Sequence, residues 1–335
     1  MSPAGFISVV ICTHNRAALL RQTLASLVTQ RLSRDAWEVI VVDNASTDTT
    51  PEVANAFSGQ LPIRRVVEPT LGLCHARNTG WREARGEYIA YLDDDTIAGE
   101  NWLMTVRDVF ARVPDAGMVG GPVAAIWTAP RPAWLSDNAA RALAIVDWGT
   151  AAHRIANVDV EWLVGANMAV VRAVLQAVGG FHPGIDRVGH NMLSSGDVHL
   201  QRRIIEHGYK VQYEPAMSIG HVIPASRLTK QWFRRRYFWQ GISDSVMRII
   251  EERPSAVRRL GWTVGSALRL AQQPRTVRAA LATLAPRDRE LIVLKFHAGM
   301  DNAEIARVVG VSESNAGTKV HRAVEKLRRA CDADR

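Results

Sequence analysis

The stretch Tyr88–Asp95 limits what this 335-residue chain can fold into more than any other. It is an apolar run that ends in three consecutive carboxylates, Asp93, Asp94 and Asp95, before a polar loop. Such a run is typical of a buried strand that delivers charge to the carboxyl edge of a parallel sheet, where open α/β folds bind ligands. Because alternate side chains of a strand share a face, we expect Asp93 and Asp95 to point the same way and Asp94 to point elsewhere.

Three adjacent carboxylates repel one another, and a bound cation would relieve that repulsion. Oxygen ligands completed by phosphate and water suit a hard divalent ion. The sequence therefore predicts a Mg²⁺ or Mn²⁺ site. The alternative is a solvated acidic turn.

The residues before this run have the pattern of a nucleotide-binding half. A strand over Phe6–Cys12 and a helix from about Asn15 to Gln30 precede a second strand, Glu38–Val42, which ends at Asp43. A strand, a helix and a second strand that ends in an acid are typical of nucleotide-binding α/β folds. The glycine-rich loops of dinucleotide and P-loop folds are absent, so phosphate must be neutralised otherwise, and a metal on Asp95 would do so.

A third strand is expected near Ile63–Val67, followed by Gly72–Gly80, which enters a helix. Within it, Arg77 has the permanently charged, planar side chain that suits a phosphate or a base. Its alternative role is that of an arginine on a helix surface.

Composition is that of an ordinary globular protein, with 47% apolar and 22% charged residues. No run approaches the roughly 18 apolar residues of a membrane span, and the N-terminus lacks the basic start of a signal peptide. We therefore expect a cytoplasmic protein. The cysteines Cys12, Cys74 and Cys331 are scattered, which favours reduced thiols.

Four motifs in order make residues 7 to about 245 resemble the family 2 glycosyltransferases of the GT-A fold. They are Ser8–Arg16, Val41–Asp48, Gly72–Gly80 and Leu92–Asp95. The resemblance implies a Rossmann-like mixed α/β sheet flanked by helices. It assigns the nucleotide half to residues 1–125, and the acceptor half with basic and aromatic helices to residues 126–272.

Site roles follow from this resemblance position by position. It implies that Thr13 and Asp43 contact the base or ribose of a nucleotide-sugar donor, and that Arg77 and Asp93 hold its diphosphate. Asp95 would then bind the metal, Mn²⁺ or Mg²⁺.

Two further residues belong to the second half. His221 matches a histidine that approaches the metal or the diphosphate in similar sequences, although a lone histidine is as often structural. Gly196-Asp197 stands where similar enzymes carry a Glu-Asp pair whose Asp is the general base. Asp197 is kept and the Glu is absent; the alternative for Asp197 is a helix N-cap.

These roles imply transfer of a sugar to a saccharide or lipid-linked acceptor in surface-glycan synthesis. A metal stabilises the charge that develops on the departing diphosphate, and a carboxylate base takes the proton of the acceptor hydroxyl. A single base opposite the leaving group implies direct displacement, with inversion at the anomeric carbon.

Basic and aromatic residues interleave over 227–241, within a stretch, 225–278, that carries 12 Lys/Arg against 3 Asp/Glu. Such a helix either lies on an anionic membrane surface, which would place the protein at the inner face of the cell membrane, or packs its rings on the catalytic domain. Nucleic-acid binding is the third and weaker alternative.

Residues 280–335 resemble region four of extracytoplasmic-function sigma factors, a helix-turn-helix that reads DNA. Matching pieces are Glu304–Ala306, Gly310–Ser312 and His321–Ala323, while Ala316 stands where a larger aliphatic residue is usual. Residues 285–335 carry 10 Lys/Arg against 8 Asp/Glu, so we expect weak DNA binding at most through 302–329. The second function class is accordingly a DNA-binding regulator whose large domain senses nucleotide sugars or is inactive.

Overall fold

The computed structural model describes residues 5–185, 187–188, 192–251, 284–292, 294–295 and 302–332. The chain forms two compact units. The first comprises Met1–Arg131 and Asp137–Arg227, and the second comprises Pro132–Ser136 and Leu228–Arg335. The transferase domain was expected to extend to residue 272, whereas the first compact unit ends at Arg227. The junction expected between residues 272 and 280 lies outside the described residues.

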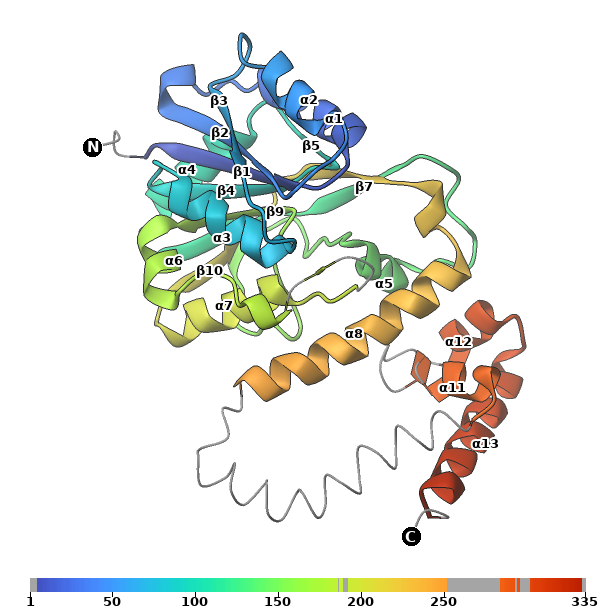
Figure 1. Cartoon of the computed structure of the whole chain (residues 1–335). Coiled ribbons are helices and arrows are strands. Elements are labelled where there is room, and N and C mark those ends of the chain that lie inside the picture. Colours follow the sequence, from blue (N-terminus) through green and yellow to red (C-terminus); the bar gives the residue numbers. More distant parts are fainter. Residues whose placement is uncertain are drawn as a thin grey trace. The chain divides into compact units, whose positions relative to one another are not determined.

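The first unit is built on a mixed sheet of eight strands in the order β3-β2-β1-β4-β9-β6-β10-β8 (Figure 1). Its strands are β1 (Ile7–Thr13), β2 (Trp37–Asp43), β3 (Ile63–Val67), β4 (Tyr88–Asp93), β6 (Ala116–Gly120), β8 (His153–Arg154), β9 (Asn167–Val171) and β10 (Lys210–Tyr213). The first four in that order are parallel, and β9 is antiparallel to both β4 and β6. The predicted mixed α/β sheet is therefore confirmed.

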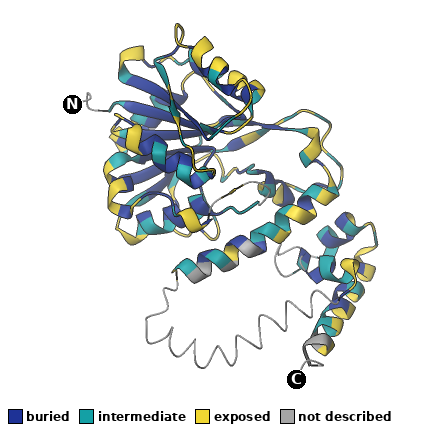
Figure 2. Ribbon diagram, viewed as in Figure 1, coloured by how far each residue is buried: buried dark blue, intermediate teal, exposed yellow. Residues whose placement is uncertain are grey.

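Helices cover both faces of this sheet (Figure 1). On one face lie α1 (Ala17–Val28), α2 (Thr50–Ala56) and α4 (Trp102–Arg112), and on the other lie α3 (Leu73–Glu83), α6 (Arg172–Val178) and α7 (Gly196–Glu206). Successive residues of β1 serve the two layers in turn: Val9 belongs to the first core and Val10 to the second. Both are fully buried, as are most residues of the central strands (Figure 2). The unit also contains α5 (Asp137–Ala140) and the short 3₁₀ turns η1 (Arg34–Ala36), η2 (Arg141–Leu143), η3 (Pro183–Ile185) and η4 (Ala225–Arg227).

A second, three-stranded sheet brings a distant segment to the end of β4. It consists of β5 (Thr96–Ala98), β11 (Ile219–Ile223) and β7 (Val123–Trp127), with β11 in the middle. The strand β5 starts directly after the three carboxylates, and His221 of β11 is paired with Thr96. A bond from the Val222 amide to the carbonyl of Asp95, at 2.8 Å, fixes the turn between β4 and β5 to the same strand.

Register places the ends of the central strands at one edge of the large sheet. Thr13, the last residue of β1, is paired with Asp43, the last residue of β2. Cys12 of β1 is paired with Asp93, the last residue of β4. The side chains expected to bind the donor therefore meet at the carboxyl edge, as predicted for a parallel arrangement.

The second unit contains α8 (Lys230–Glu251), α11 (Pro286–Ile292), α12 (Asn302–Val309) and α13 (Glu313–Asp332). Gly310, at φ +71°, makes the turn between α12 and α13 in a conformation that favours glycine. Ala316 and Ala323 of α13 are fully buried, which shows that the small Ala316 lies in the core of this helical region. The expected helical C-terminal region is confirmed.

Among the described residues, no helix is both long enough and apolar enough to cross a bilayer.

Close packing of α3 on the sheet depends on Gly80. A methyl group there would lie 2.3 Å from Cγ1 of Val10 in β1. Because both partners are in the core, we expect Gly80→Ala to lower the free energy of unfolding by about 1–3 kcal/mol through overpacking. Urea denaturation measures the change, with Gly59→Ala as the matched control, since a methyl group on Gly59 meets nothing within 4 Å. Equal stabilities of the two variants would contradict this packing.

Candidate active site

The three carboxylates at the end of β4 do not alternate as a strand would make them. Because β4 ends at Asp93, Asp94 and Asp95 form a turn. The expectation that Asp94 would point away from Asp95 is wrong, since both carboxylates bind the same guanidinium. Asp93 instead pairs with a different arginine, Arg77.

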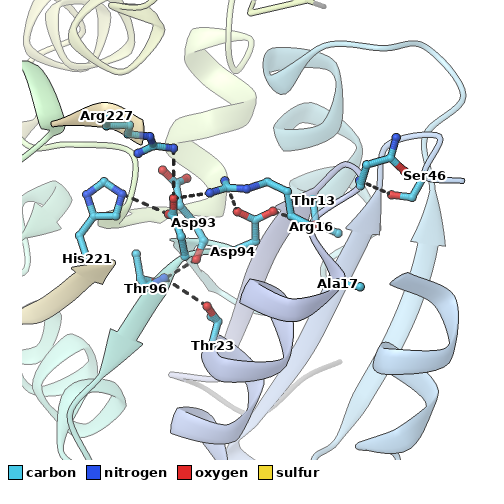
Figure 3. Close-up of polar contacts among 12 residues, drawn as sticks. Thr13, Arg16, Ala17, Thr23, Ser46, Asp93, Asp94, Thr96, His221 and Arg227 are labelled. Atoms are coloured by element: carbon cyan, nitrogen blue, oxygen red, sulfur yellow. Dashed lines mark hydrogen bonds and ion pairs between the residues drawn. The ribbon is translucent and has the colours of Figure 1, made fainter. Parts of the chain in front are cut away.

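Arg16 is the cation that Asp94 and Asp95 share. Figure 3 shows its side chain directed at Asp94. Its Nη1 donates to Asp94 Oδ1 at 2.5 Å, and its Nη2 donates to Asp95 Oδ2 at 2.6 Å. Both carboxylates are almost fully buried. The planar fork of an arginine can serve two acceptors at once, so one side chain compensates two buried charges.

The loop that carries Arg16 is held by a neighbouring loop. Asn15, in the left-handed region at φ 53°, accepts the Thr47 amide at 2.7 Å through its side-chain oxygen. In return, Asp48 Oδ2 accepts the amide of Ala17, the first residue of α1, at 3.0 Å. These reciprocal bonds lie on either side of Arg16 in the sequence and fix its backbone.

Asp95 also contacts two residues that are distant in sequence. Its Oδ1 lies 3.2 Å from His221 Nε2, and its Oδ2 lies 3.4 Å from Arg227 Nη2. Burial works against the charge of Asp95. The hydrogen bond with His221 and the charges of Arg16 and Arg227 nevertheless hold the pKa of Asp95 below its usual range.

Asp94 responds in the opposite direction. Burial raises its pKa and the neighbouring charge of Asp95 adds to the rise, although Arg16 and a hydrogen bond from Thr13 counteract both. The Thr13 hydroxyl donates to Asp94 Oδ2 at 2.7 Å. The Thr13 side chain thus supports the carboxylate pair directly.

Asp43, the expected nucleoside contact, is buried and already has two partners. Its Oδ1 accepts the Ser46 amide at 2.9 Å, and its Oδ2 accepts Arg65 Nη1 at 2.8 Å. These contacts fix the orientation of the carboxylate at the edge of the sheet.

Asp95 and His221 have the spacing of two ligands of one metal ion. Adjacent ligands of an octahedral ion with bonds of about 2.1 Å are about 3 Å apart, close to the 3.2 Å between Asp95 Oδ1 and His221 Nε2. His221 Nδ1 is buried without a hydrogen-bond partner, so no contact there fixes the tautomer. Within the described ranges, no group of three or more His, Cys, Asp or Glu side chains is arranged to hold a metal. The pair fits an ion whose other ligands come from elsewhere.

Asp197 is the second residue of α7 and not its N-cap, a position that Ser195 occupies. One carboxylate oxygen, Oδ2, accepts the Gly165 amide at 2.9 Å. Asp197 is only half-buried. A carboxylate that is held by a backbone amide and is accessible to solvent can take a proton from a hydroxyl.

Three arginines of this site were not expected from the sequence: Arg16, Arg65 and Arg227. Arg16 belongs to the first motif, and the single signal that could have found it is that two buried carboxylates need a cation. Arg65 and Arg227 reach the site through strand pairing and a turn after β11, which residue spacing does not reveal.

Comparison with known proteins places most of the first unit in one family. Residues 8–177, half of the chain, match the family described as glycosyl transferase family 2. Residues 275–327 match sigma-70, region 4. The second match covers only the C-terminal region.

Curated relatives include glycosyltransferases of archaea and bacteria. The glucosyl-dolichyl phosphate glucuronosyltransferase of Haloferax volcanii is 26% identical over 249 residues, covering 73% of this chain and 78% of that protein. The validoxylamine A glucosyltransferase of Streptomyces hygroscopicus is 38% identical over 122 residues, which is 36% of this chain but only 29% of that protein.

Among solved structures, S. aureus TarS 1-349 in complex with UDP has a TM-score of 0.53 at 15% identity, covering 98% of this chain and 90% of that one. At this identity the likeness shows the fold alone, which is the GT-A-like fold expected from the sequence.

Removing Arg16 should destabilise the protein, because it leaves Asp94 and Asp95 buried beside each other with less positive charge. We expect Arg16→Ala to lower the free energy of unfolding by about 2–4 kcal/mol. The matched control is Arg31→Ala, whose partner Glu100 lies on the surface, and which should cost less than about 1 kcal/mol. Urea denaturation of both variants decides the matter: similar losses would mean that Arg16 does not compensate the carboxylates.

Proposed function

Because the chain belongs to glycosyl transferase family 2 and so acts on nucleotide sugars, we propose that it transfers the sugar with inversion and with the help of a divalent metal. The proposed acceptor is a saccharide or a lipid-linked acceptor in surface-glycan synthesis. The observation that carries this proposal is the meeting of Asp43, Asp93 and the Arg16-bound pair at one edge of the sheet.

On the donor side, Asp43 and Thr13 are proposed to recognise the nucleoside. A carboxylate only accepts hydrogen bonds, so Asp43 suits a base with a ring N–H, such as uracil or guanine. Asp93 is half-buried, and its carboxylate reaches the solvent side of the same edge. It is proposed to face the sugar and diphosphate end of the donor.

The metal is proposed to bind between Asp95 and His221, with phosphate oxygens and water as further ligands. When bound, it stabilises the negative charge that develops on the departing diphosphate. Arg16 and Arg227 occupy Oδ2 of Asp95 and leave Oδ1 toward His221. The chain therefore presents one carboxylate oxygen and one imidazole nitrogen. Mn²⁺ or Mg²⁺ is proposed because the carboxylate, phosphate and water oxygens suit these ions.

Asp197 is proposed as the general base that takes the proton of the acceptor hydroxyl as that oxygen attacks the anomeric carbon. The Gly165 amide holds Oδ2 and so orients the carboxylate. Because one base and one leaving group suffice for a single displacement, the configuration of the sugar is inverted.

A lipid-linked acceptor is supported by the name of the Haloferax relative, which includes dolichyl phosphate. Contact with a membrane through residues 227–241, at the inner face of the cell membrane, is part of this proposal. Phe233 of α8 is buried with its ring centroid 5.2 Å from that of Trp134, whereas Arg235 and Phe238 are exposed. Packing accounts for Phe233, and the exposed residues are those proposed to meet lipid headgroups.

A donor screen tests the function. Purified protein is incubated with UDP- and GDP-sugars in Mn²⁺ or in chelator, and release of the nucleoside diphosphate is measured. We expect Mn²⁺-dependent turnover with one donor class. Asp197→Asn should lower kcat by roughly two to four orders of magnitude, the usual worth of a positioned base.

Asp159→Asn is the matched control, since Asp159 is an exposed acid whose partner is Arg202. Turnover of Asp197→Asn near that of the control would remove Asp197 from the mechanism, and full turnover in chelator would remove the metal.

A second, weaker activity is proposed for the helix-turn-helix, because residues 275–327 match a DNA-binding module. Four basic residues of α13 recur at intervals of three and four: Lys319, Arg322, Lys326 and Arg329. Lys326 pairs with Asp288 at 2.6 Å, and Arg329 lies 4.0 Å from Glu325. Lys319 and Arg322 are then the two best placed to meet phosphates.

We therefore expect weak DNA binding, whose affinity falls only modestly as the salt concentration rises. With about two phosphate contacts, a plot of log K against log salt should have a slope of about −2, without sequence preference. Fluorescence anisotropy of labelled duplex DNA with the full chain measures it, and Lys319→Gln with Arg322→Gln should abolish it. Tight, sequence-selective binding would instead favour the DNA-binding regulator.

A further inference from the structure

Family resemblance implied that Arg77 binds the diphosphate of the donor. Arg77 is, however, the least accessible of the arginines described at this edge of the sheet. Its side chain is 7% exposed. One face of its guanidinium lies 5.4 Å from the centroid of the Phe181 ring. A diphosphate needs open space around the N–H groups that bind it. One face of this guanidinium is covered by the Phe181 ring.

The opposite boundary of Arg77 is the backbone of Gly165. A methyl group on Gly165 would lie 2.2 Å from Nη2 and 2.6 Å from Cζ of Arg77. Because the guanidinium passes this close to the main chain, a larger residue than glycine at position 165 would clash with it. The same residue donates its amide to Asp197 Oδ2 at 2.9 Å.

Two carboxylates act on Arg77 from different halves of the fold. Nη2 donates to Asp93 Oδ1 at 3.1 Å. Burial disfavours the charge of Arg77, but the negative charges of Asp93 and Asp197 outweigh it and raise the pKa of Arg77 above its usual value. Asp93 ends β4 and Asp197 is the second residue of α7, so the charges of both segments act on Arg77.

Asp93 and Asp197 are also the acids of this site that remain partly open to solvent, while Asp43, Asp94 and Asp95 are buried. The two open carboxylates are those that a donor and an acceptor would reach. Arg77 binds Asp93 directly and packs against Gly165, whose amide holds Asp197, so its side chain helps to set the separation of the two carboxylates.

We propose that Arg77 is a positioning residue that holds the base Asp197 in register with the donor-side carboxylate Asp93, and that it does not bind the diphosphate. This inference rests on the proposed role of Asp197. It differs from the role that family resemblance implied for Arg77, which was a contact with the diphosphate.

The two roles predict opposite kinetics for Arg77→Gln in the full chain. If Arg77 positions Asp197, kcat falls by roughly 100-fold while the Kd of UDP or GDP in Mn²⁺, measured by calorimetry, changes less than about threefold. If Arg77 binds the diphosphate, that Kd rises tenfold or more. Arg82→Gln is the control, since Arg82 is an exposed arginine of the same helix, and it should change neither quantity.

A double variant shows whether Arg77 acts through the base. Because residues that act as one unit are not additive, Arg77→Gln combined with Asp197→Asn should have a kcat within about threefold of Asp197→Asn alone. Multiplied losses would overturn the proposal. If Asp197→Asn alone keeps its turnover, Asp197 is not the general base. If Asp197→Asn loses turnover and the nucleotide Kd of Arg77→Gln rises, Asp197 remains the base but Arg77 is not its positioning residue.

Gly165→Ala gives an independent test that leaves Arg77 in the chain. The added methyl group must displace the guanidinium, so this variant should also lose kcat and keep its nucleotide affinity. Gly99→Ala is its control, since a methyl group there meets nothing within 4 Å. Circular dichroism checks folding, and should Arg77→Gln not fold, Arg77→Lys and Gly165→Ala carry the same comparison of kcat with Kd. Unchanged kcat in a folded Gly165→Ala would contradict the proposal.

Discussion

The bond between one guanidinium and two buried carboxylates is the interaction on which the site depends. Asp94 and Asp95 are adjacent in the chain and almost fully buried, and neither could keep a charge there without a cation. Arg16 serves both, and the reciprocal bonds of Asn15 and Asp48 hold the loop that carries it. The turn between β4 and β5 is therefore fixed before any ligand arrives, which leaves one oxygen of Asp95 directed at His221.

A second arginine organises the other half of the site in a different way. Arg77 is enclosed by Phe181 and Gly165 and lies under the influence of Asp93 and Asp197. Asp93 binds Arg77 directly, and Asp197 is held by the amide of Gly165, the glycine against which Arg77 packs. Both arginines pair with acids of this edge, so much of the positive charge there is bound within the protein's own framework.

Much of this arrangement could be predicted from the sequence, because apolar runs and their terminal acids identify strands and the edge they share. The strand Ile63–Val67 has the predicted bounds, and Thr13, Asp43 and Asp93 meet at one edge. The pairing of Asp94 with Asp95 could not be predicted, since it depends on β4 ending at Asp93. Arg227 and Arg65 escaped detection because their contacts are set by tertiary structure, and α8 belongs to a different compact unit than its sequence position suggested.

Anomalous diffraction from crystals soaked with Mn²⁺ and the nucleoside diphosphate tests the central claim most directly, because it locates the ion and shows the arginines in the same map. The account predicts one manganese peak at bonding distance, about 2.1–2.3 Å, from both Asp95 Oδ1 and His221 Nε2, with Arg16 still bridging Asp94 and Asp95. A peak elsewhere, or an ion bound at Asp95 in the place of the Arg16 guanidinium, would contradict it.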